Sequence, residues 1–322
     1  MRRTRLLRSL VVLATTALLA GCGADAAVPR SAPVSPVRPL PPDSQTIKPS
    51  TTPAAQCGDP TTSLTPSSGA FAPDSTMARI KAKGRLTVGV DQNTYLFGFR
   101  DPSTGQLEGF DIDLAREIAR DLFGDPNRIE LRSVSTAERV PVLTDNRVDM
   151  VVRTFSVTCE RRRDIAFSSA YFTAAQRILA AKTSGIRSAA DLDGKRVCVT
   201  VGADSADRLF ALNLPHPPTV LGVTNWTDCL VALQQGQVDA VSTDEPILAG
   251  LAAQDVNLQV VGGPLGYEYY AVGLPHGQDD MVRFVNGVLD RIRADGTWQR
   301  LYNAGLGSLG PSTGPPAAHY SG

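Results

Sequence analysis

Val148-Asp149-Met150-Val151-Val152 is a short and largely apolar run of the kind that forms a buried β-strand. Upstream, residues 86–90 predict another strand, and residues 111–123 predict a helix with Asp111 as its N-cap. Downstream, strands are expected at 196–200, 238–242 and 269–274, and helices from near Asp204 and over 279–292. This alternation predicts an α/β fold with mainly parallel sheets, whose ligands bind beyond the carboxyl ends of the strands.

The composition excludes several classes of function. The chain has 322 residues, and 32 Lys and Arg balance 32 Asp and Glu, so the formal net charge is zero. A polyanion-binding protein would carry a basic excess, and aromatic residues at 6% are too few for a stacking platform. The three histidines show no metal-ligand spacing, so neither a metal nor a cofactor is expected. A Gly-x-Gly-x-x-Gly match at 305–310 follows no strand and opens no helix, so it fails as a dinucleotide site.

The N-terminus has the features of an export signal. A basic start is followed by the apolar run 10–19. This run is too short to cross a bilayer, which requires a helix of about 20 apolar residues. Leu19-Ala20-Gly21-Cys22 then resembles the bacterial lipobox, in which the cysteine is lipidated. We therefore expect a signal peptide over 1–21 and a lipid anchor at Cys22. The mature protein would be held at the extracytoplasmic face of the cell membrane.

Two segments are expected to be irregular. Residues 22–76 are rich in Pro, Ser and Thr and predict an extended tether, and residues 308–322 predict a disordered tail. Export leaves four cysteines in an oxidising compartment, which allow three pairings. We favour Cys198 with Cys229 and Cys57 with Cys159, and the partner of Cys57 stays open at this point.

The segment 154–168 carries the most informative chemistry. Hydroxyl side chains at Thr154, Ser156 and Thr158 follow a predicted strand and precede three consecutive arginines, 161–163. Hydroxyls and free backbone N–H groups at a strand end can hold a carboxylate, and one arginine can bind it bidentately. The alternative is the solvated start of a basic helix, and these residues alone do not decide between the two.

Several segments resemble the extracellular solute-binding proteins, family 3, of polar amino-acid ABC transporters. The matching segments are Gly84-Arg85-Leu86-Thr87-Val88-Gly89-Val90, Gly109-Phe110-Asp111-Ile112-Asp113-Leu114-Ala115, 148–150, 154–168, 191–197, 236–240 and 295–298. The resemblance extends from about residue 77 to 307 and is closest to actinobacterial glutamate- and aspartate-binding lipoproteins. It implies a two-lobed clamp of type II with two hinge crossovers, near 172–175 and 266–270. Lobe one would span 77–174 and 270–307, and lobe two 175–269. The spacing of Cys198 and Cys229 also resembles that subgroup.

The resemblance implies a role for each residue of an amino-acid site. Arg161 would bind the α-carboxylate, assisted by Ser156 and by the backbone of Thr154. Asp244 would bind the ammonium, although it is also placed to act as an N-cap before Pro246. The lobe-two contacts would come from Thr200 and from the amides around Ala203 and Asp204, where relatives often carry threonine instead of Ala203.

Side-chain selection is expected to depend on Arg139. In the resembling acidic-ligand binders, an arginine at this position meets the side-chain carboxylate; a surface helix arginine is the alternative. Arg153 either adds positive potential or is peripheral. Asp91 favours cationic ligands, and one interpretation pairs it with Arg139 and tempers that charge. We expect L-glutamate and L-aspartate as ligands, with L-asparagine or L-glutamine tolerated.

The partner of the clamp cannot be read from the sequence. One hypothesis is delivery of the amino acid to an ABC transporter permease, and another is sensing through a membrane receptor. A third is a dehydratase on the same fold, which we disfavour because no histidine lies near the site segments to act as a general acid. A monomer and no nucleic-acid partner are expected.

Overall fold

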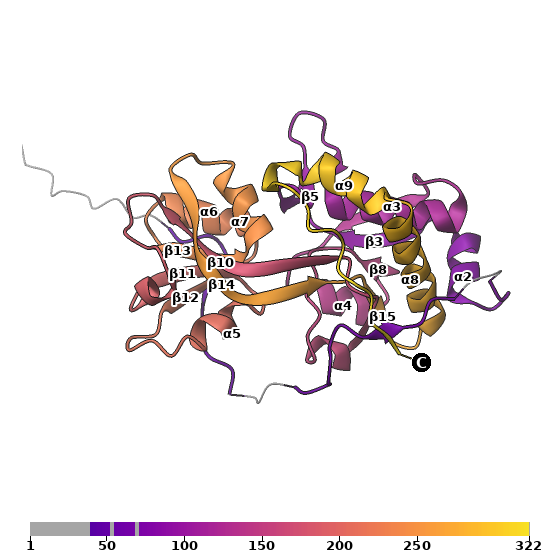
Figure 1. Ribbon diagram of the computed structural model, residues 1–322, viewed down its shortest axis with the longest axis horizontal. Helices are drawn as coiled ribbons and strands as arrows, with labels where there is room; N and C mark the ends of the chain where they lie inside the picture. Colours follow the sequence, from indigo (N-terminus) through magenta and orange to yellow (C-terminus); the bar gives the residue numbers. More distant parts are fainter. Residues whose placement is uncertain (1–38, 52–54, 68–70, 322) are drawn as a thin grey trace, which may run out of the picture. The chain divides into compact units, whose positions relative to one another are not determined.

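A computed structural model of the chain describes residues 39–51, 55–67 and 71–321 (Figure 1). The expected signal peptide and the lipidation site Cys22 lie outside these residues. Among the residues that the structure describes, no helix combines the length and the apolar character needed to cross a membrane.

The first of two main sheets has five strands in the order β7-β3-β8-β15-β9. Strands β3, β7 and β8 are parallel, whereas β15 pairs antiparallel to β8 and β9. This sheet and its helices form lobe one. Its strands are β3 (Leu86–Val90), β7 (Ile129–Ser133), β8 (Met150–Val151), β9 (Ile165–Phe167) and β15 (Gly273–Pro275). A small meander of β4 (Asn93–Thr94), β5 (Gly98–Arg100) and β6 (Leu107–Glu108) follows β3.

Within the described residues, five helices belong to lobe one, and those over 110–123 and 139–144 pack directly on strands of the first sheet. The helix over 110–123 buries the apolar face that its spacing predicts. Its fully buried residues on that face are Ile112, Ala115, Ile118 and Ala119. The helices are α2 (Thr76–Lys83), α3 (Phe110–Phe123), α4 (Arg139–Thr144), α8 (Asp279–Ala294) and α9 (Thr297–Gly305), with short 3-10 turns η1 (Arg161–Arg163) and η3 (Gly307–Leu309). Asp111 does not cap α3, because the helix begins at Phe110 and Gly109 occupies the cap position.

The second main sheet has six strands in the order β1-β12-β11-β13-β10-β14 and forms lobe two. Strands β11, β12 and β13 are parallel, and β1, β10 and β14 run antiparallel to their neighbours. Its strands are β1 (Gln45–Ile47), β10 (Phe172–Ala181), β11 (Arg196–Thr200), β12 (Thr219–Val223), β13 (Ala240–Asp244) and β14 (Leu258–Tyr270). The associated helices are η2 (Ala189–Leu192), α5 (Ser205–Phe210), α6 (Trp226–Gln234) and α7 (Glu245–Ala252).

Strands β10 and β14 connect the two lobes. They pair from Phe172↔Tyr270 to Ala181↔Leu258, and Figure 1 shows them running side by side. Phe172 and Tyr270 belong to the core of lobe one, whereas Ile178 and Val261 belong to the core of lobe two. The architecture is therefore the expected two-lobed α/β clamp with mixed sheets. The residue limits set above for each lobe stay a prediction.

The segments expected to be irregular form more structure than their composition suggests. Within 22–76, β1 pairs with β12, and β2 (Ser63–Leu64) pairs with β16 (Tyr320–Ser321) from the expected tail. Tyr320 Oη also donates a 2.6 Å hydrogen bond to Asp290. The predicted tether and tail therefore contain paired strands at β1, β2 and β16, while their limits at 22–76 and 308–322 stay a prediction. Open sheet edges and buried acceptors supply backbone and side-chain partners that composition does not reveal.

Both favoured disulfides are present. Cys198 of β11 is bonded to Cys229 of α6, and Cys57 is bonded to Cys159, which lies just before η1. The pairing of the four cysteines is thereby confirmed.

Candidate functional site

The candidate site lies where strands of both lobes end. Thr200 and Asp244 stand at the carboxyl ends of β11 and β13 in lobe two, and Thr154 and Ser156 follow β8 in lobe one. Such strand ends present side chains and unpaired backbone groups at one edge of a sheet. The two sets face each other, because Thr200 Oγ1 lies 3.3 Å from Thr136 Oγ1 of lobe one.

Arg161 contacts both lobes. Its Nη1 donates to the carbonyl of Ser156 at 2.6 Å, and its Nη2 donates to the carbonyl of Gly202 at 3.0 Å. The same Nη2 lies 3.5 Å from Asp204 Oδ1, and the guanidinium lies over the ring of Phe155. The alternative of a solvated basic helix does not hold for Arg161, because its side chain is only 11% exposed.

Arg139 is fixed beside it by backbone carbonyls. Its Nε, Nη1 and Nη2 donate to the carbonyls of Thr136 (2.9 Å), Thr154 (3.2 Å) and Gly202 (3.1 Å). Its guanidinium carbon lies 4.4 Å from the centre of the Phe155 ring. Burial, followed by repulsion from Arg161, lowers the pKa of Arg139 well below its usual value. Two buried guanidinium groups therefore share one aromatic ring and one carbonyl, and Arg139 is not a surface helix residue.

Asp91 pairs with Arg153, not with Arg139. Arg153 Nη2 lies 2.9 Å from Asp91 Oδ2, and both side chains are almost fully buried. Asp91 also accepts from the backbone N–H groups of Gln92 and Asn93. The interpretation that Asp91 tempers Arg139 is wrong, because Asp91 neutralises Arg153 instead. Asp91 is thus engaged away from Arg139, and the acidic side chain next to Arg161 is Asp204 of lobe two.

Asp244 is a buried carboxyl group in lobe two. Its Oδ2 accepts a hydrogen bond from Tyr270 Oη at 2.5 Å, and its side chain does not cap α7. Burial, together with the charge of Asp204, raises the pKa of Asp244 to about 7. Within the described part of the chain, no cationic side chain forms an ion pair with Asp244. An ammonium group would supply the missing counter-charge.

Asp204 belongs to a second acidic group on the same lobe. It shares a hydrogen bond with Glu268 of β14, and Arg208 Nε donates to Glu268 Oε1 at 2.9 Å. Burial and the nearby charges of Asp204 and Asp244 raise the pKa of Glu268 to about 8. Lobe two thus brings the carboxyl groups of Asp204, Asp244 and Glu268 close together, and the raised pKa values of Asp244 and Glu268 leave both partly protonated near neutral pH.

Thr154 has an unusual backbone conformation. Its φ of +36° lies in the left-handed region that residues other than glycine rarely adopt. Its N–H donates to Asp111 Oδ2 at 2.7 Å, and its carbonyl accepts from Arg139. The N–H that could have held a ligand carboxylate is therefore engaged within lobe one.

A small cavity collects most of the expected ligand-binding residues. Arg139, Thr154, Ser156, Ala203, Asp204 and Asp244 line it. Arg161 lines a neighbouring cavity of about 680 Å³ that also reaches Arg139, Ala203 and Asp204. Thr200 is fully buried. Neither Thr200 nor Asp91 lines either of these two cavities.

The sequence analysis assigned no role to four further residues of the site. Thr136, Trp226 and Thr243 line the small cavity, and Phe155 lies beneath both arginines. Phe155 lies within the segment 154–168, so the sequence could have indicated that it belongs to the site. Trp226 and Thr243 reach the site only through the packing of α6 and β13, for which the sequence holds no local signal. In the described ranges, no cluster of three or more His, Cys, Asp or Glu side chains could hold a metal ion.

The two-lobed fold agrees with a match to a family model. Residues 86–307 match the bacterial extracellular solute-binding proteins, family 3, and the chain belongs to this family. Members of the family are solute-binding transport proteins rather than enzymes.

Its relatives are amino-acid-binding proteins of ABC transporters. The chain is 35% identical over 228 residues to the ABC transporter glutamine-binding protein GlnH of Bacillus subtilis, covering 70% of this chain and 83% of that protein. It is 30% identical over 250 residues to the glutamate-binding protein GluB of Corynebacterium efficiens, covering 73% and 82%.

Solved structures show the same fold. A mutant of the arginine-binding protein of T. maritima superposes with a TM-score of 0.66 at 29% identity, over 71% of this chain and 98% of that one. The cysteine-binding protein of Campylobacter jejuni gives a TM-score of 0.69 at 27% identity, over 74% and 96%.

Proposed function

We propose that this protein binds L-glutamate and L-aspartate, tolerates L-glutamine and L-asparagine, and delivers the amino acid to an ABC transporter permease. One observation carries the proposal: Arg139 and Arg161 of lobe one converge on the Gly202 carbonyl of lobe two, and Arg139 lines the same small cavity as the buried carboxyl group of Asp244. Closure of the two lobes therefore brings two cations and one carboxylate to the same small space, as an acidic amino acid requires.

In this proposal, each charged group of the ligand has a partner among the residues of the site. The α-carboxylate would bind Arg161 and the hydroxyl of Ser156, and the ammonium would bind Asp244. Both charges leave water, so each requires an opposite charge or several hydrogen bonds. Charge-assisted hydrogen bonds contribute about 1.5–3 kcal/mol each. Several of them, less the cost of closure, support a micromolar Kd, about −8 kcal/mol.

Arg139 is the proposed selector of the side-chain carboxylate. A guanidinium has five N–H donors, and backbone carbonyls engage three of those of Arg139. Two N–H groups are then left for a ligand, on a cation that no acidic side chain neutralises by direct pairing within the described residues. The positive charge of Arg139 also opposes a cationic ligand.

Calorimetric titration of the full chain with L-Glu, L-Asp, L-Asn, L-Gln and L-Arg tests the proposal. We expect micromolar binding of the acids and none of L-Arg. Arg161→Ala should abolish binding of every ligand, whereas Arg139→Ala should weaken the acids more than the amides. Arg163→Ala is the matched control, because its side chain is 61% exposed on the same turn. Binding of L-Arg alone, or equal losses for acids and amides in Arg139→Ala, would refute the assignment.

We also propose that Cys22 anchors the protein to the outer face of the cell membrane. The support is the lipobox-like Leu19-Ala20-Gly21-Cys22 after an apolar run. Cys22→Ser should release the protein into the medium or the soluble fraction. Retention of the variant in the membrane fraction would contradict the anchor.

A further inference from the structure

The N-terminal segment reaches from one lobe to the other. We use "strap" for residues 45–51 and 55–57, which the chain joins through residues 52–54. Its first part, β1, pairs with β12 at the edge of the lobe-two sheet, from Gln45↔Gly222 to Ile47↔Val220. Ile47 packs so closely on Gly222 that a Cβ there would lie 2.6 Å from its Cδ1. The strap precedes residue 86, so it lies outside the part that matches the family model.

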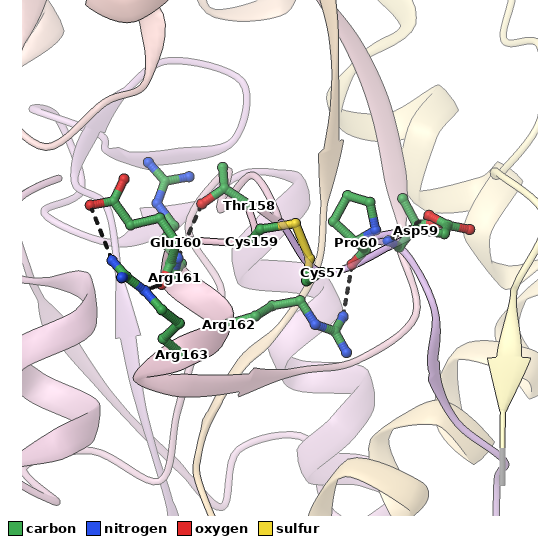
Figure 2. The surroundings of a disulfide bond; sticks show 10 residues. Cys57, Asp59, Pro60, Thr158, Cys159, Glu160, Arg161, Arg162 and Arg163 are labelled. Carbon is green, nitrogen blue, oxygen red and sulfur yellow. Dashed lines mark hydrogen bonds and ion pairs between the residues drawn. A yellow bond between two sulfur atoms is a disulfide. The ribbon is translucent and has the colours of Figure 1, made fainter. Parts of the chain in front are cut away.

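The other end of the strap is fixed to the turn that carries Arg161. Cys57 is bonded to Cys159, two residues before Arg161, and Arg162 Nη1 donates to the carbonyl of Pro60 at 2.7 Å. Along the chain these two contacts flank Arg161, and Figure 2 shows them close together on one side of the turn. Within the turn, the Arg161 N–H donates to Thr158 Oγ1. The position of Arg161 is therefore tied to the strap from outside the binding site.

Between its two ends, the strap borders the site. Pro49, Ser50 and Ala55 line the cavity that Arg139 and Arg161 also line. That cavity takes its other walls from α4 and η1 of lobe one and from α5 of lobe two. The strap thus crosses between the lobes where the binding arginines lie, at residues distinct from the β10–β14 hinge.

We propose that the strap is a working part of the clamp: its disulfide holds the turn of Arg161 and links that turn to lobe two. Reduction of this one disulfide then weakens amino-acid binding. The proposal rests on the proposed function for the ligand, but the site that it adds is the strap. A covalent link between lobes lowers the entropy of the separated arrangement more than that of the closed one.

The disulfide is open to exchange, unlike its counterpart in lobe two. Cys57 is exposed and Cys159 is half-buried, whereas Cys198 and Cys229 are fully buried. A dithiol reductant would attack Sγ of Cys57 through its thiolate and release Cys159 as a thiolate. Arginines 161–163 follow Cys159 closely in the sequence, and positive charge near a cysteine favours its thiolate as a leaving group. The second thiol of the reductant then frees Cys57 and closes its own disulfide, so two electrons and two protons reach the protein.

The size of the effect follows from what remains attached. After reduction, the Pro60–Arg162 hydrogen bond and the pairing of β2 with β16 still hold the chain to lobe one. We therefore expect the coupling between the disulfide and the binding site to lie at the lower end of the usual range, which corresponds to a Kd about fivefold weaker after reduction.

The test is calorimetry of the full chain with L-glutamate before and after mild dithiothreitol treatment. Alkylation and mass spectrometry verify that Cys57 and Cys159, but not Cys198 and Cys229, have become free thiols. We expect a weaker Kd that reoxidation restores. The C57S/C159S variant should bind as the reduced protein does and should not respond to the reductant. An unchanged Kd after selective reduction would overturn the proposal.

Hydrogen exchange separates this proposal from the proposed function. Without any ligand, reduction should speed amide exchange over 157–164 and leave β11 unaffected. If the oxidised protein binds none of the amino acids but exchange over 157–164 responds, the proposed ligand is wrong and the strap's hold on this turn stands. If exchange over 157–164 does not change, the strap proposal fails whatever the ligand.

Discussion

Asp244 is held in its buried position by Tyr270, whose hydroxyl donates to Oδ2. Burial raises the pKa of Asp244 to about 7, so near neutral pH about half of the molecules carry it protonated. A ligand ammonium pairs only with the ionised form and therefore lowers this pKa on binding. Amino-acid binding is therefore strongest above the pKa of Asp244 in the free protein and weakens as the pH falls through that pKa.

The first prediction concerns this pH dependence. With a pKa of about 7, the ionised fraction falls about tenfold from pH 8 to pH 6. The affinity for a neutral-side-chain ligand such as L-glutamine should fall by a similar factor, as measured by calorimetry across this range. L-Glutamine is the right probe because its side chain does not titrate there.

Asp244→Asn provides the control for that prediction. The amide cannot ionise, so the variant should bind weakly at every pH and show a flat profile between pH 6 and 8. A sloped profile in Asp244→Asn would assign the titration to another group, of which Glu268 is the nearest candidate.

The sequence identified the charged residues of the site but not how they pair. Strands β3 and β8 are parallel neighbours with the register Val88↔Met150. Carrying that register forward by three residues puts Asp91 beside Arg153, and the structure shows that ion pair. The register depends on which strands adjoin, and a single sequence does not contain that information.

At the scale of elements, one buried carboxyl group joins three segments of lobe one. Asp111, in the first turn of α3, accepts from the Thr154 N–H after β8 and from Tyr171 Oη before β10, both at 2.7 Å. Its side chain is fully buried, and burial raises its pKa to about 7. This residue supports the left-handed backbone at Thr154, and Thr154 in turn accepts from Arg139.

The second prediction is a loss of stability on removing this junction. Asp111→Ala leaves the buried N–H of Thr154 and the hydroxyl of Tyr171 without their acceptor. Each such orphaned group costs about 1–3 kcal/mol, so the loss of two acceptors should lower the free energy of unfolding by about 2–6 kcal/mol. Urea denaturation at pH 7 measures it.

Asp113→Ala is the matched control for Asp111→Ala. Asp113 lies in the same helical turn, but its side chain is 36% exposed and pairs only with Arg116. An exposed pair of this kind contributes less than about 1 kcal/mol. Equal losses in the two variants would show that the junction at Asp111 does not hold these segments together.

The longer elements could be predicted, and the shortest could not. The helix over 279–292 was expected and is α8, because eight of its residues bury one face at helical spacing. Strands β1, β2 and β16 have two or three residues each, amid Pro, Ser and Thr. Hydrogen bonds at open edges form such strands, so no side-chain pattern marks them.

At the scale of the whole clamp, the two-lobed architecture was foreseen through the resemblance and not from periodicity. Alternating strands and helices indicate an α/β fold, but they do not reveal that β10 and β14 extend from the sheet of lobe two into the core of lobe one. Of the strap, the sequence indicated the disulfide Cys57–Cys159 but not the pairing of β1 with β12, which joins Gln45 to Gly222. Long-range pairing of this kind is a property of the folded chain.

The last prediction concerns how closely the lobes approach each other. Gly202 of lobe two has a φ of +83°, and a Cβ there would lie 2.7 Å from Ala137 Cα and 3.0 Å from Ala137 N in lobe one. Both are backbone atoms, which cannot swing aside as a side chain can. Gly202→Ala must therefore push the lobes apart and lengthen the hydrogen bonds from Arg139 and Arg161 to the Gly202 carbonyl.

We expect Gly202→Ala to weaken amino-acid binding about tenfold or more, a loss of about 1.4 kcal/mol. Small-angle scattering should also show less compaction on adding ligand. Gly194→Ala is the matched control, because Gly194 also lies in lobe two with φ +64° but has no atom nearer than 3.8 Å to a Cβ. Both variants carry the left-handed backbone cost of about 1 kcal/mol, so only the clash with lobe one differs. If Gly202→Ala binds and compacts as Gly194→Ala does, the closed clamp does not require contact at Gly202, and the convergence of the arginines on its carbonyl is incidental to binding.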